Sequence, residues 1–211
     1  PFTDVPAGSW YYGAAAYAYN NGLFGGTSPT TFAPSAVMSR AMFVTVLWRL
    51  AGAPAPKGVN TFSDVPGGTW YTDAVTWAAE NGVVSGIGGG RFAPNSNVTR
   101  EQTAEILFNY AHSCGYDVGA RADLSAFPDA GSVSGWAKDA LADAVALGLI
   151  SGASNGGQTY LDPQGSASRE QHITSVEEIP WQVTENFALP ISLGKITRTP
   201  YQIEKAVYTK E

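Results

Sequence analysis

The sequence predicts an all-α domain in which three helix-loop-helix repeats pack around a shared helical core. The first observation is a pattern that occurs three times with constant spacing: 12 residues from Trp to Gly, 4 from that Gly to the next, and 6 from Pro to Arg. The second is that two helical segments flank a Gly-rich turn in every copy. The third is length, because one copy is too short to enclose a core and three together would bury one.

The repeats cover residues 1–53, 61–115 and 124–179, and residues 180–211 form a divergent tail. Each repeat contains, in order, an aromatic residue, Asp, Trp, two Gly, Pro and Arg. The members are Phe2, Asp4, Trp10, Gly22, Gly26, Pro34 and Arg40; Phe62, Asp64, Trp70, Gly82, Gly86, Pro94 and Arg100; and Phe127, Asp129, Trp136, Gly148, Gly152, Pro163 and Arg169.

The first helix of each repeat is predicted to begin at the motif Trp. Ser9 and Thr69 precede Trp10 and Trp70 and are suitable N-cap residues, because a hydroxyl oxygen can accept from a free amide of the first turn. Apolar positions with helical spacing follow, and Gly82 stands where a left-handed residue would end the helix. Residues 11–21 and 136–147 repeat this plan.

The second helix of each repeat is predicted to begin at the motif Arg, after a Ser or Thr cap. Thr99 and Gln102 have the spacing of a capping box. Ser168 and Gln171 have it too, whereas Met42 removes the box from the first repeat. Positions 4, 7 and 10 after each Arg predict a buried stripe. They are Val44, Leu47, Leu50, Ala104, Leu107, Tyr110, Ile173, Val176 and Ile179.

The third repeat departs from the other two at both ends of its second helix. It carries three extra residues in the preceding turn, which we expect in a surface loop. Pro180 is predicted to end the helix early. Residues 172–211 hold one of the 24 Gly and none of the Asp, so the tail differs in composition. It is a short unrelated segment, the start of another module, or a frameshifted end, and we assign it no function.

Composition excludes several classes of protein. The net charge of −6 does not favour a broad nucleic-acid surface, which needs a basic face. No run of 18 apolar residues predicts a membrane span. The single cysteine, Cys114, cannot form an internal disulfide. The chain begins at Pro1 without an initiator Met or a signal-peptide pattern, so we expect a piece or a processed form of a larger protein.

The repeated Arg, Trp and Asp residues each allow two interpretations. A cation in the first helical turn opposes the helix dipole, so a triple occurrence favours an anion-binding role beside free helix amides over a solvated side chain. The Trp residues either fill the core or stack on sugar rings. The Asp residues, taken alone, are more typical of turns. Together these residue types could form a saccharide pocket. Trp48 and Trp77 do not recur in register and are interpreted as packing residues.

The combined pattern Phe-x-Asp-Val, Trp, Gly, Gly, Phe-x-Pro and Thr-Arg-Glu resembles the S-layer homology (SLH) repeat of bacterial surface proteins. The resemblance covers about 170 of the 211 residues. It implies a pseudo-threefold helical domain at the cell surface or cell wall, with ligand grooves between adjacent repeats and no cofactor. The implied function is non-covalent anchoring of a larger surface protein. The implied partner is a peptidoglycan-linked secondary cell-wall polysaccharide, usually an acidic glycan with ketal-linked pyruvate.

The resemblance also implies a role for each repeated residue. Carboxylate binding falls to Arg40, Arg100 and Arg169, stacking to Trp10, Trp70 and Trp136, and hydroxyl binding to Asp4, Asp64 and Asp129. The first repeat lacks the acidic residue after its Arg, and the third has a longer loop and an extra residue before Trp136. We therefore expect the Arg100 groove to function best, the Arg40 groove next and the Arg169 groove least.

No catalytic or metal-binding residues are predicted. No carboxylate pair recurs as a glycosidase site would require, and Gly-x-Ser-x-Gly is absent. His112 and His172 lack Cys or acidic partners at zinc spacing, and both are expected near helix surfaces. The alternative to glycan binding is self-assembly or another protein–protein contact, in which the repeated Arg and Trp would be interface residues.

Overall fold

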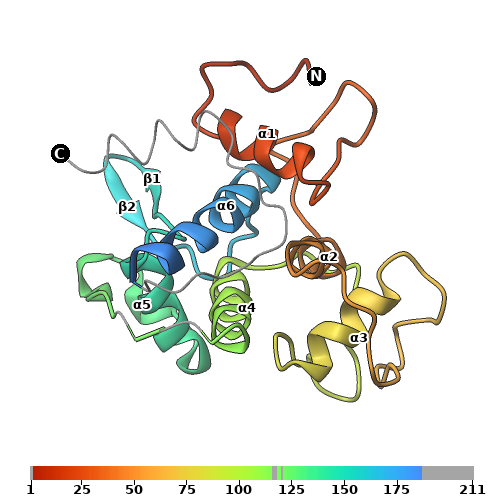
Figure 1. The fold of residues 1–211 in the computed structure, drawn as a ribbon. Coiled ribbons are helices and arrows are strands. Elements are labelled where there is room, and N and C mark those ends of the chain that lie inside the picture. The colour runs from red at the N-terminus through yellow and green to blue at the C-terminus, as the bar shows by residue number, and fades with distance from the viewer. Residues whose placement is uncertain (1, 116–117, 120, 187–211) are drawn as a thin grey trace.

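The computed structural model describes residues 2–115, 118–119 and 121–186, with side chains described as far as residue 177. This part of the chain forms six α-helices, three short 3₁₀ helices and one antiparallel two-stranded sheet (Figure 1). The helices are α1 (Tyr12–Asn20), α2 (Arg40–Leu50), α3 (Thr72–Glu80), α4 (Arg100–Ser113), α5 (Lys138–Ala146) and α6 (Arg169–Asn186). The 3₁₀ helices are Leu124–Ala126, Ala130–Ser132 and Gly135–Ala137, and the strands are β1 (Ala153–Asn155) and β2 (Gln158–Tyr160).

The first helix of each repeat packs against the second helix of a different repeat. Helix α3 packs on α2, α5 packs on α4, and α1 packs on α6, which comes from the far end of the chain (Figure 1). The pairing thus runs from the first repeat to the second, from the second to the third, and from the third back to the first.

Backbone hydrogen bonds between repeats follow the same order. The first two amides of each second helix donate to two carbonyl oxygens of the next repeat, at the motif Pro and two residues after it. The bonds are Arg40 to Ser96 and Ala41 to Pro94, Arg100 to Gly165 and Glu101 to Pro163, and Arg169 to Ala36 and Glu170 to Pro34, all between 2.8 and 3.0 Å. These amides have no partner inside their own helix, so the next repeat satisfies them.

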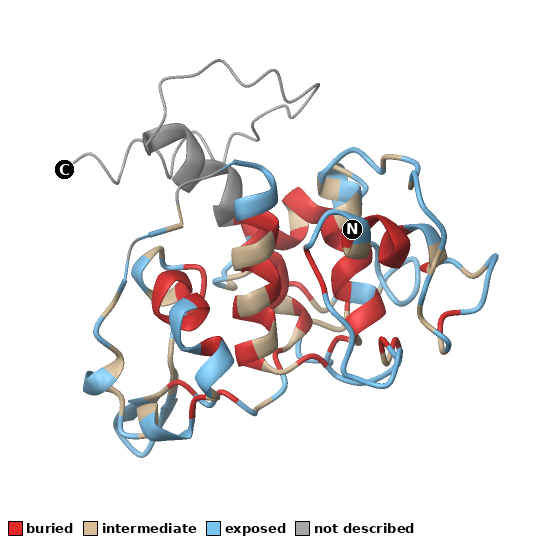
Figure 2. Ribbon diagram, turned by 90° about the horizontal axis from the view of Figure 1, so that it is seen from below, coloured by how far each residue is buried: buried red, intermediate tan, exposed pale blue. Residues whose placement is uncertain are grey.

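The core contains residues from both helices of every repeat, and Figure 2 shows buried residues on the helices in the middle of the molecule and exposed residues mainly in the loops around them. Every described member of the predicted stripe is buried except Leu50, which is half-buried, and the side chain of Ile179 lies outside the described residues. Three residues at equivalent positions, three after each motif Arg, also come together. The ring of His172 lies 4.4 Å from that of Phe43, and its Nε2 is 3.1 Å from the hydroxyl of Thr103.

Two motif residues, Phe and the second Gly, are explained by close packing. A Cβ atom on Gly86 would lie 2.6 Å from the Arg91 carbonyl oxygen and 3.0 Å from Cε1 of Phe62. The equivalent position Gly26 is similarly close to Phe2. Only glycine allows the turn and the aromatic ring to meet here.

Several local predictions are confirmed. Thr99 and Gln102 form both bonds of a capping box. Ser168 and Gln171 do so as well. Gly82 ends α3 with a φ of 70°, and the Val83 amide donates to the Ala78 carbonyl in a Schellman pattern.

Four predictions are wrong. Helices α1 and α3 begin two residues after Trp10 and Trp70, because the Tyr12 and Thr72 amides first close separate turns onto Ser9 and Thr69. The fold is not purely α-helical, since the extra residues of the third repeat form the β1–β2 hairpin.

Helix α6 continues past Pro180 to Asn186, since a proline can kink a helix without ending it. His172 is fully buried rather than near the surface. The predicted divergent tail lies outside the described residues from 187 onward.

Candidate functional site

The three motif Arg side chains are buried and point into the next repeat. Arg40 donates from Nε to the Phe92 carbonyl oxygen (2.8 Å) and from Nη2 to that of Ser85 (3.3 Å). Arg100 makes the equivalent two bonds, to the carbonyl oxygens of Leu161 and Ser151. Each of these guanidinium groups thus ties two repeats together.

Arg169 makes the equivalent connection to the first repeat differently. Its Nη2 donates to the Gly25 carbonyl oxygen at 2.9 Å, but its buried Nε has no hydrogen-bond partner. Its guanidinium carbon lies 3.8 Å from the ring centroid of Phe24 and 4.9 Å from that of Phe32. Burial lowers the pKa of Arg169 to about 10, with Asp4 acting in the opposite direction. The side chain therefore remains a cation at neutral pH.

The motif Asp residues fasten the turn that precedes the second helix. The two oxygens of Asp64 accept the Phe92 and Ala93 amides, both at 2.8 Å. Asp4 and Asp129 make the equivalent pairs of bonds in the first and third repeats. Ala93 has a φ of 59°, a left-handed conformation that this pair of bonds holds in place.

The Asp carboxylates also lie near the Arg of the preceding repeat. The amide of Phe32 and, more weakly, that of Ala33 lower the pKa of Asp4, against the effect of burial, and Arg169 contributes. Asp64 in turn acts on Arg40: burial lowers the pKa of Arg40 and the Asp64 charge opposes this shift. The structure thus gives each Asp main-chain partners, while its predicted part in ligand binding stays a prediction.

The motif Trp residues are the most exposed large aromatic side chains of the described chain. Trp10, Trp70 and Trp136 are 60%, 59% and 55% exposed, because each lies in the turn before a helix and not within its buried face. Of the two other Trp residues whose side chains are described, Trp77 is buried and Trp48 half-buried, as expected for packing residues. The motif Trp residues are not core residues.

The Arg40 groove has a volume of about 440 Å³ and takes its walls from all three repeats. Arg40 comes from the first repeat, the segment 83–87 and helix α4 from the second, and Trp136 from the third. Residues Gln102, Glu105 and Asn109 present the polar side of α4 to it. Pockets of this size hold small ligands in other proteins.

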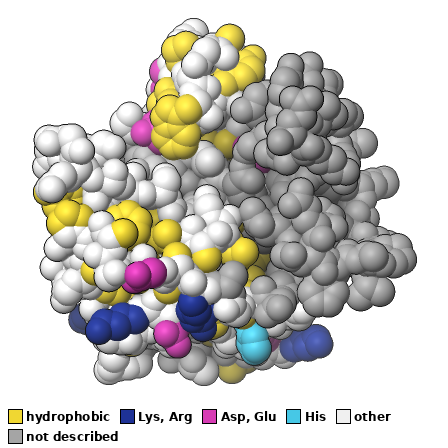
Figure 3. Space-filling view, turned by 90° about the vertical axis from the view of Figure 1, so that its left-hand side faces the viewer, with side chains coloured by type: hydrophobic (Ala, Val, Ile, Leu, Met, Phe, Trp, Pro, Cys, Tyr) yellow, Lys and Arg dark blue, Asp and Glu magenta, His cyan; other side chains and the backbone are white. Residues whose placement is uncertain are grey.

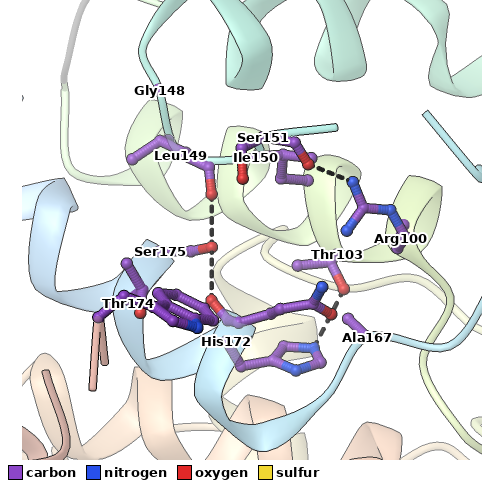
Figure 4. Close-up of a pocket in the computed structure, with 12 residues that line it drawn as sticks. Arg100, Thr103, Gly148, Leu149, Ile150, Ser151, Ala167, His172, Thr174 and Ser175 are labelled. Atoms are coloured by element: carbon purple, nitrogen blue, oxygen red, sulfur yellow. Dashed lines mark hydrogen bonds between the residues drawn. The ribbon is translucent and has the colours of Figure 1, made fainter. Parts of the chain in front are cut away.

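The Arg100 groove is built by the same rule and is smaller, about 50 Å³. Figure 4 shows Arg100 directed at Ser151, the hydrogen bond from Ser175 to Leu149 to its left, and the bond between Thr103 and His172 below it. Trp10 of the first repeat completes the lining. Each groove therefore joins the Arg of one repeat, the Gly-rich turn of the next and the Trp of the third.

Sequence reasoning missed two aspects of these grooves. The repeat that supplies each Trp depends on how the chain closes on itself, and spacing does not contain that information. The polar helix residues were detectable, because positions 2 and 5 after Arg lie on the face opposite the buried stripe.

The first-turn amides are not free for an anion: two donate to the next repeat, and the third donates to the cap hydroxyl. The expected anion site can involve only the guanidinium.

Charge is mixed on the surface. On the face shown in Figure 3, basic and acidic side chains lie close to one another toward the lower edge, and apolar side chains occupy part of the middle. None of the helices in the described part of the chain is long and apolar enough to cross a membrane. Across the same residues, no three His, Cys, Asp or Glu side chains are grouped to hold a metal ion.

The fold and grooves define a helical repeat module whose grooves lie between repeats, and the Arg40 groove is large enough for a small ligand. The model of the S-layer homology domain matches residues 1–42, 61–104 and 126–171. The chain belongs to this family, which places it at the cell surface or cell wall and gives it a role in cell-wall anchoring. The S-layer homology domain is a non-catalytic anchoring module that also stands beside catalytic domains.

Similar proteins include an endoglucanase of Bacillus sp. (strain KSM-635), 31% identical over 88% of this chain and 19% of its own length. The surface-layer 125 kDa protein of Lysinibacillus sphaericus is 32% identical over 88% of this chain and 16% of its own length. The chain thus spans less than a fifth of either relative. Among solved structures, an undecaheme cytochrome from the S-layer of Carboxydothermus ferrireducens matches 86% of this chain and 23% of its own, with 16% identity and a TM-score of 0.45.

Proposed function

We propose that this domain anchors a larger surface protein by binding a secondary cell-wall polysaccharide in its inter-repeat grooves. The observation that carries the proposal is the joint presence, in both described grooves, of a buried guanidinium group and an exposed indole. An indole face suits the apolar face of a sugar ring, and a guanidinium suits a carboxylate.

The proposed ligand is an acidic glycan with ketal-linked pyruvate. Arg40 and Arg100 each donate from Nε and Nη2 to hold the next repeat, so the hydrogens of Nη1 remain for a ligand carboxylate in their grooves. Ligand hydroxyls would meet Gln102 and Asn109 in one groove and Gln171 and Thr174 in the other. The cyclic helix pairing further supports pseudo-threefold symmetry, in which Trp70 would stand over Arg169.

The test is calorimetric titration of the 211-residue chain with pyruvylated wall polysaccharide and with the same glycan stripped of pyruvate. The motif Arg residues are unsuitable probes, because their loss would weaken the fold. Trp10→Ala and Trp136→Ala remove exposed side chains, and each should weaken binding about tenfold while stability stays within about 0.5 kcal/mol. Tyr12→Ala, an exposed aromatic outside both grooves, is the matched control and should bind normally.

Three results would count against the proposal. If the glycan stripped of pyruvate binds equally well, the pyruvate carboxylate has no part in recognition. Normal binding by both Trp variants would move the site away from the grooves. Self-association without glycan binding would favour the assembly role.

A further inference from the structure

The two described grooves differ in charge at one position of the second helix. Glu105 of α4 lines the Arg40 groove, and Thr174 of α6 lines the Arg100 groove. The two positions are equivalent, because each lies five residues after the Arg that begins its own helix. The first repeat also has Thr there, at Thr45. Among the lining residues whose side chains the structure describes, this carboxylate belongs to the Arg40 groove only.

The carboxylate of Glu105 lacks a cationic partner in the described structure. It is half-buried, and the hydrogen bond given for it comes from the Asn109 amide at a long 3.4 Å. Burial raises the pKa of Glu105, and the Asn109 bond offsets this only in part. No ion pair joins Arg40 to Glu105 among the described residues, so the nitrogen and oxygen atoms of their charged groups are more than 4.0 Å apart. A partly desolvated charge without an opposite charge favours a ligand that supplies one.

Arg40 and Glu105 therefore give one groove a positive and a negative wall. Arg40 is held in place by two carbonyl oxygens of the second repeat, which fixes the positive wall. Trp136 closes the third side with an exposed ring. A ligand that fits must present an anion and a cation at separate points, with an apolar face between them.

We propose that the Arg40 groove recognises a sugar unit that carries both an acidic group and a free, protonated amino group, and that Glu105 determines this preference. The inference rests on the proposed glycan binding and names the substrate class of one groove. The ammonium donates to Glu105, the acid accepts from Arg40, and the ring stacks on Trp136. The Arg100 groove, with Thr174 in place of the carboxylate, does not select for an amino group.

The test uses four monosaccharides that share one ring: muramic acid with amino and carboxyl groups, N-acetylmuramic acid with the carboxyl alone, glucosamine with the amino group alone, and N-acetylglucosamine with neither. The indole N–H signals of Trp136 and Trp10 in NMR spectra of the whole chain report on the two grooves separately. Muramic acid should shift the Trp136 signal with about tenfold higher affinity than N-acetylmuramic acid. The Trp10 signal should not distinguish them.

Glu105→Thr introduces the residue found at the same position in α2 and α6, so the helix should tolerate it. It should remove the preference for muramic acid over N-acetylmuramic acid that the Trp136 signal reports. Glu105→Gln, which retains the side-chain shape, should do the same. Thr174→Glu is the reciprocal variant and should create the preference at Trp10. The inference is overturned if acetylation has no effect at Trp136, or if the preference persists in Glu105→Thr.

The two proposals fail differently. If wall polysaccharide shifts both indole signals while acetylation has no effect, the amino-sugar preference alone is wrong. If neither the polysaccharide nor any monosaccharide shifts either signal, glycan binding is wrong and the preference is wrong with it.

Discussion

Arg100 and Arg169 occupy the same motif position and are both buried residues, yet they hold their repeats together by different interactions. Arg100 makes two hydrogen bonds to carbonyl oxygens of the third repeat. Arg169 makes one, leaves Nε without a partner, and packs between Phe24 and Phe32. The facing repeats also differ, since Ile150 and Leu161 of the third stand where the first has Phe24 and Phe32. A motif residue thus keeps its position while its bonding depends on its surroundings.

The largest expected effect comes from removing the better-bonded Arg. Arg100→Ala leaves two carbonyl oxygens without their donor and should lower the free energy of unfolding by about 4 kcal/mol, since a hydrogen bond to a charged group contributes about 1.5–3 kcal/mol. Arg169→Ala loses one such bond and should cost about 2 kcal/mol. Urea denaturation measures both. Arg91→Ala, at an exposed position, is the control. Equal losses for the two motif variants would contradict the larger contribution expected of Arg100.

The next effect concerns His172, which lies beside Arg100. Its Nδ1–H donates to the Ser168 carbonyl at 2.8 Å, and burial lowers the pKa of His172 to about 4, against the effect of that bond and aided by Arg100. The native state thus disfavours protonation. The contribution of the neutral ring to the free energy of unfolding should be fully present above the unfolded pKa of about 6.5. The free energy of unfolding should then fall by about 3 kcal/mol as the pH drops to about 4.

Thermal unfolding between pH 7 and 4 tests this contribution. His172→Phe, which places there the residue found at position 43, should reduce the acid loss relative to the wild type. His112→Gln, at an exposed position, should leave it unchanged. An identical pH profile for all three proteins would contradict the buried neutral ring.

A smaller effect should come from making the Arg169 junction resemble the Arg100 junction. Phe24→Ile introduces the counterpart of Ile150 and should cost about 1–2 kcal/mol through lost burial. It should also free Arg169 to donate from Nε to the Phe32 carbonyl, as Arg40 does to Phe92. Calorimetry with wall glycan should then show one additional binding event. An unchanged stoichiometry would show that Phe24 does not limit this groove.

The smallest effect is local to the first repeat. Met42→Gln would complete the capping box that Ser39 begins by accepting the residue 42 amide at 3.2 Å. A gain of about 0.5 kcal/mol is expected, because the new side chain satisfies one further amide. Urea denaturation detects this, and Met42→Leu, which cannot accept a hydrogen bond, should give no gain.

Features set by neighbours in the chain were predictable from the sequence. The buried stripe, the caps at Thr99 and Ser168 and the left-handed Gly82 all follow from periodicity and from backbone chemistry within a few residues. His172 could have been recognised, since it shares a position with Phe43 and Thr103 next to the apolar stripe.

Features set by contacts between distant parts of the chain were not predictable from the sequence. That Trp136 lies in the groove of Arg40, and Trp10 in that of Arg100, depends on which repeats meet in space. The helix starts were misplaced because the Tyr12 and Thr72 amides bond to earlier turns, a choice that no local pattern encodes. The roles of the nine motif residues in ligand binding stay predictions.

The three-part lining of each groove sets a minimum size for a working domain. Because one groove needs an Arg, a turn and a Trp from three different repeats, a pair of repeats contains no complete groove. The number of complete grooves therefore does not grow in proportion to the number of repeats. It is zero for one or two repeats, and several grooves form at once when the third repeat joins. A proteolytic cut that releases any repeat should therefore abolish attachment instead of weakening it by a third.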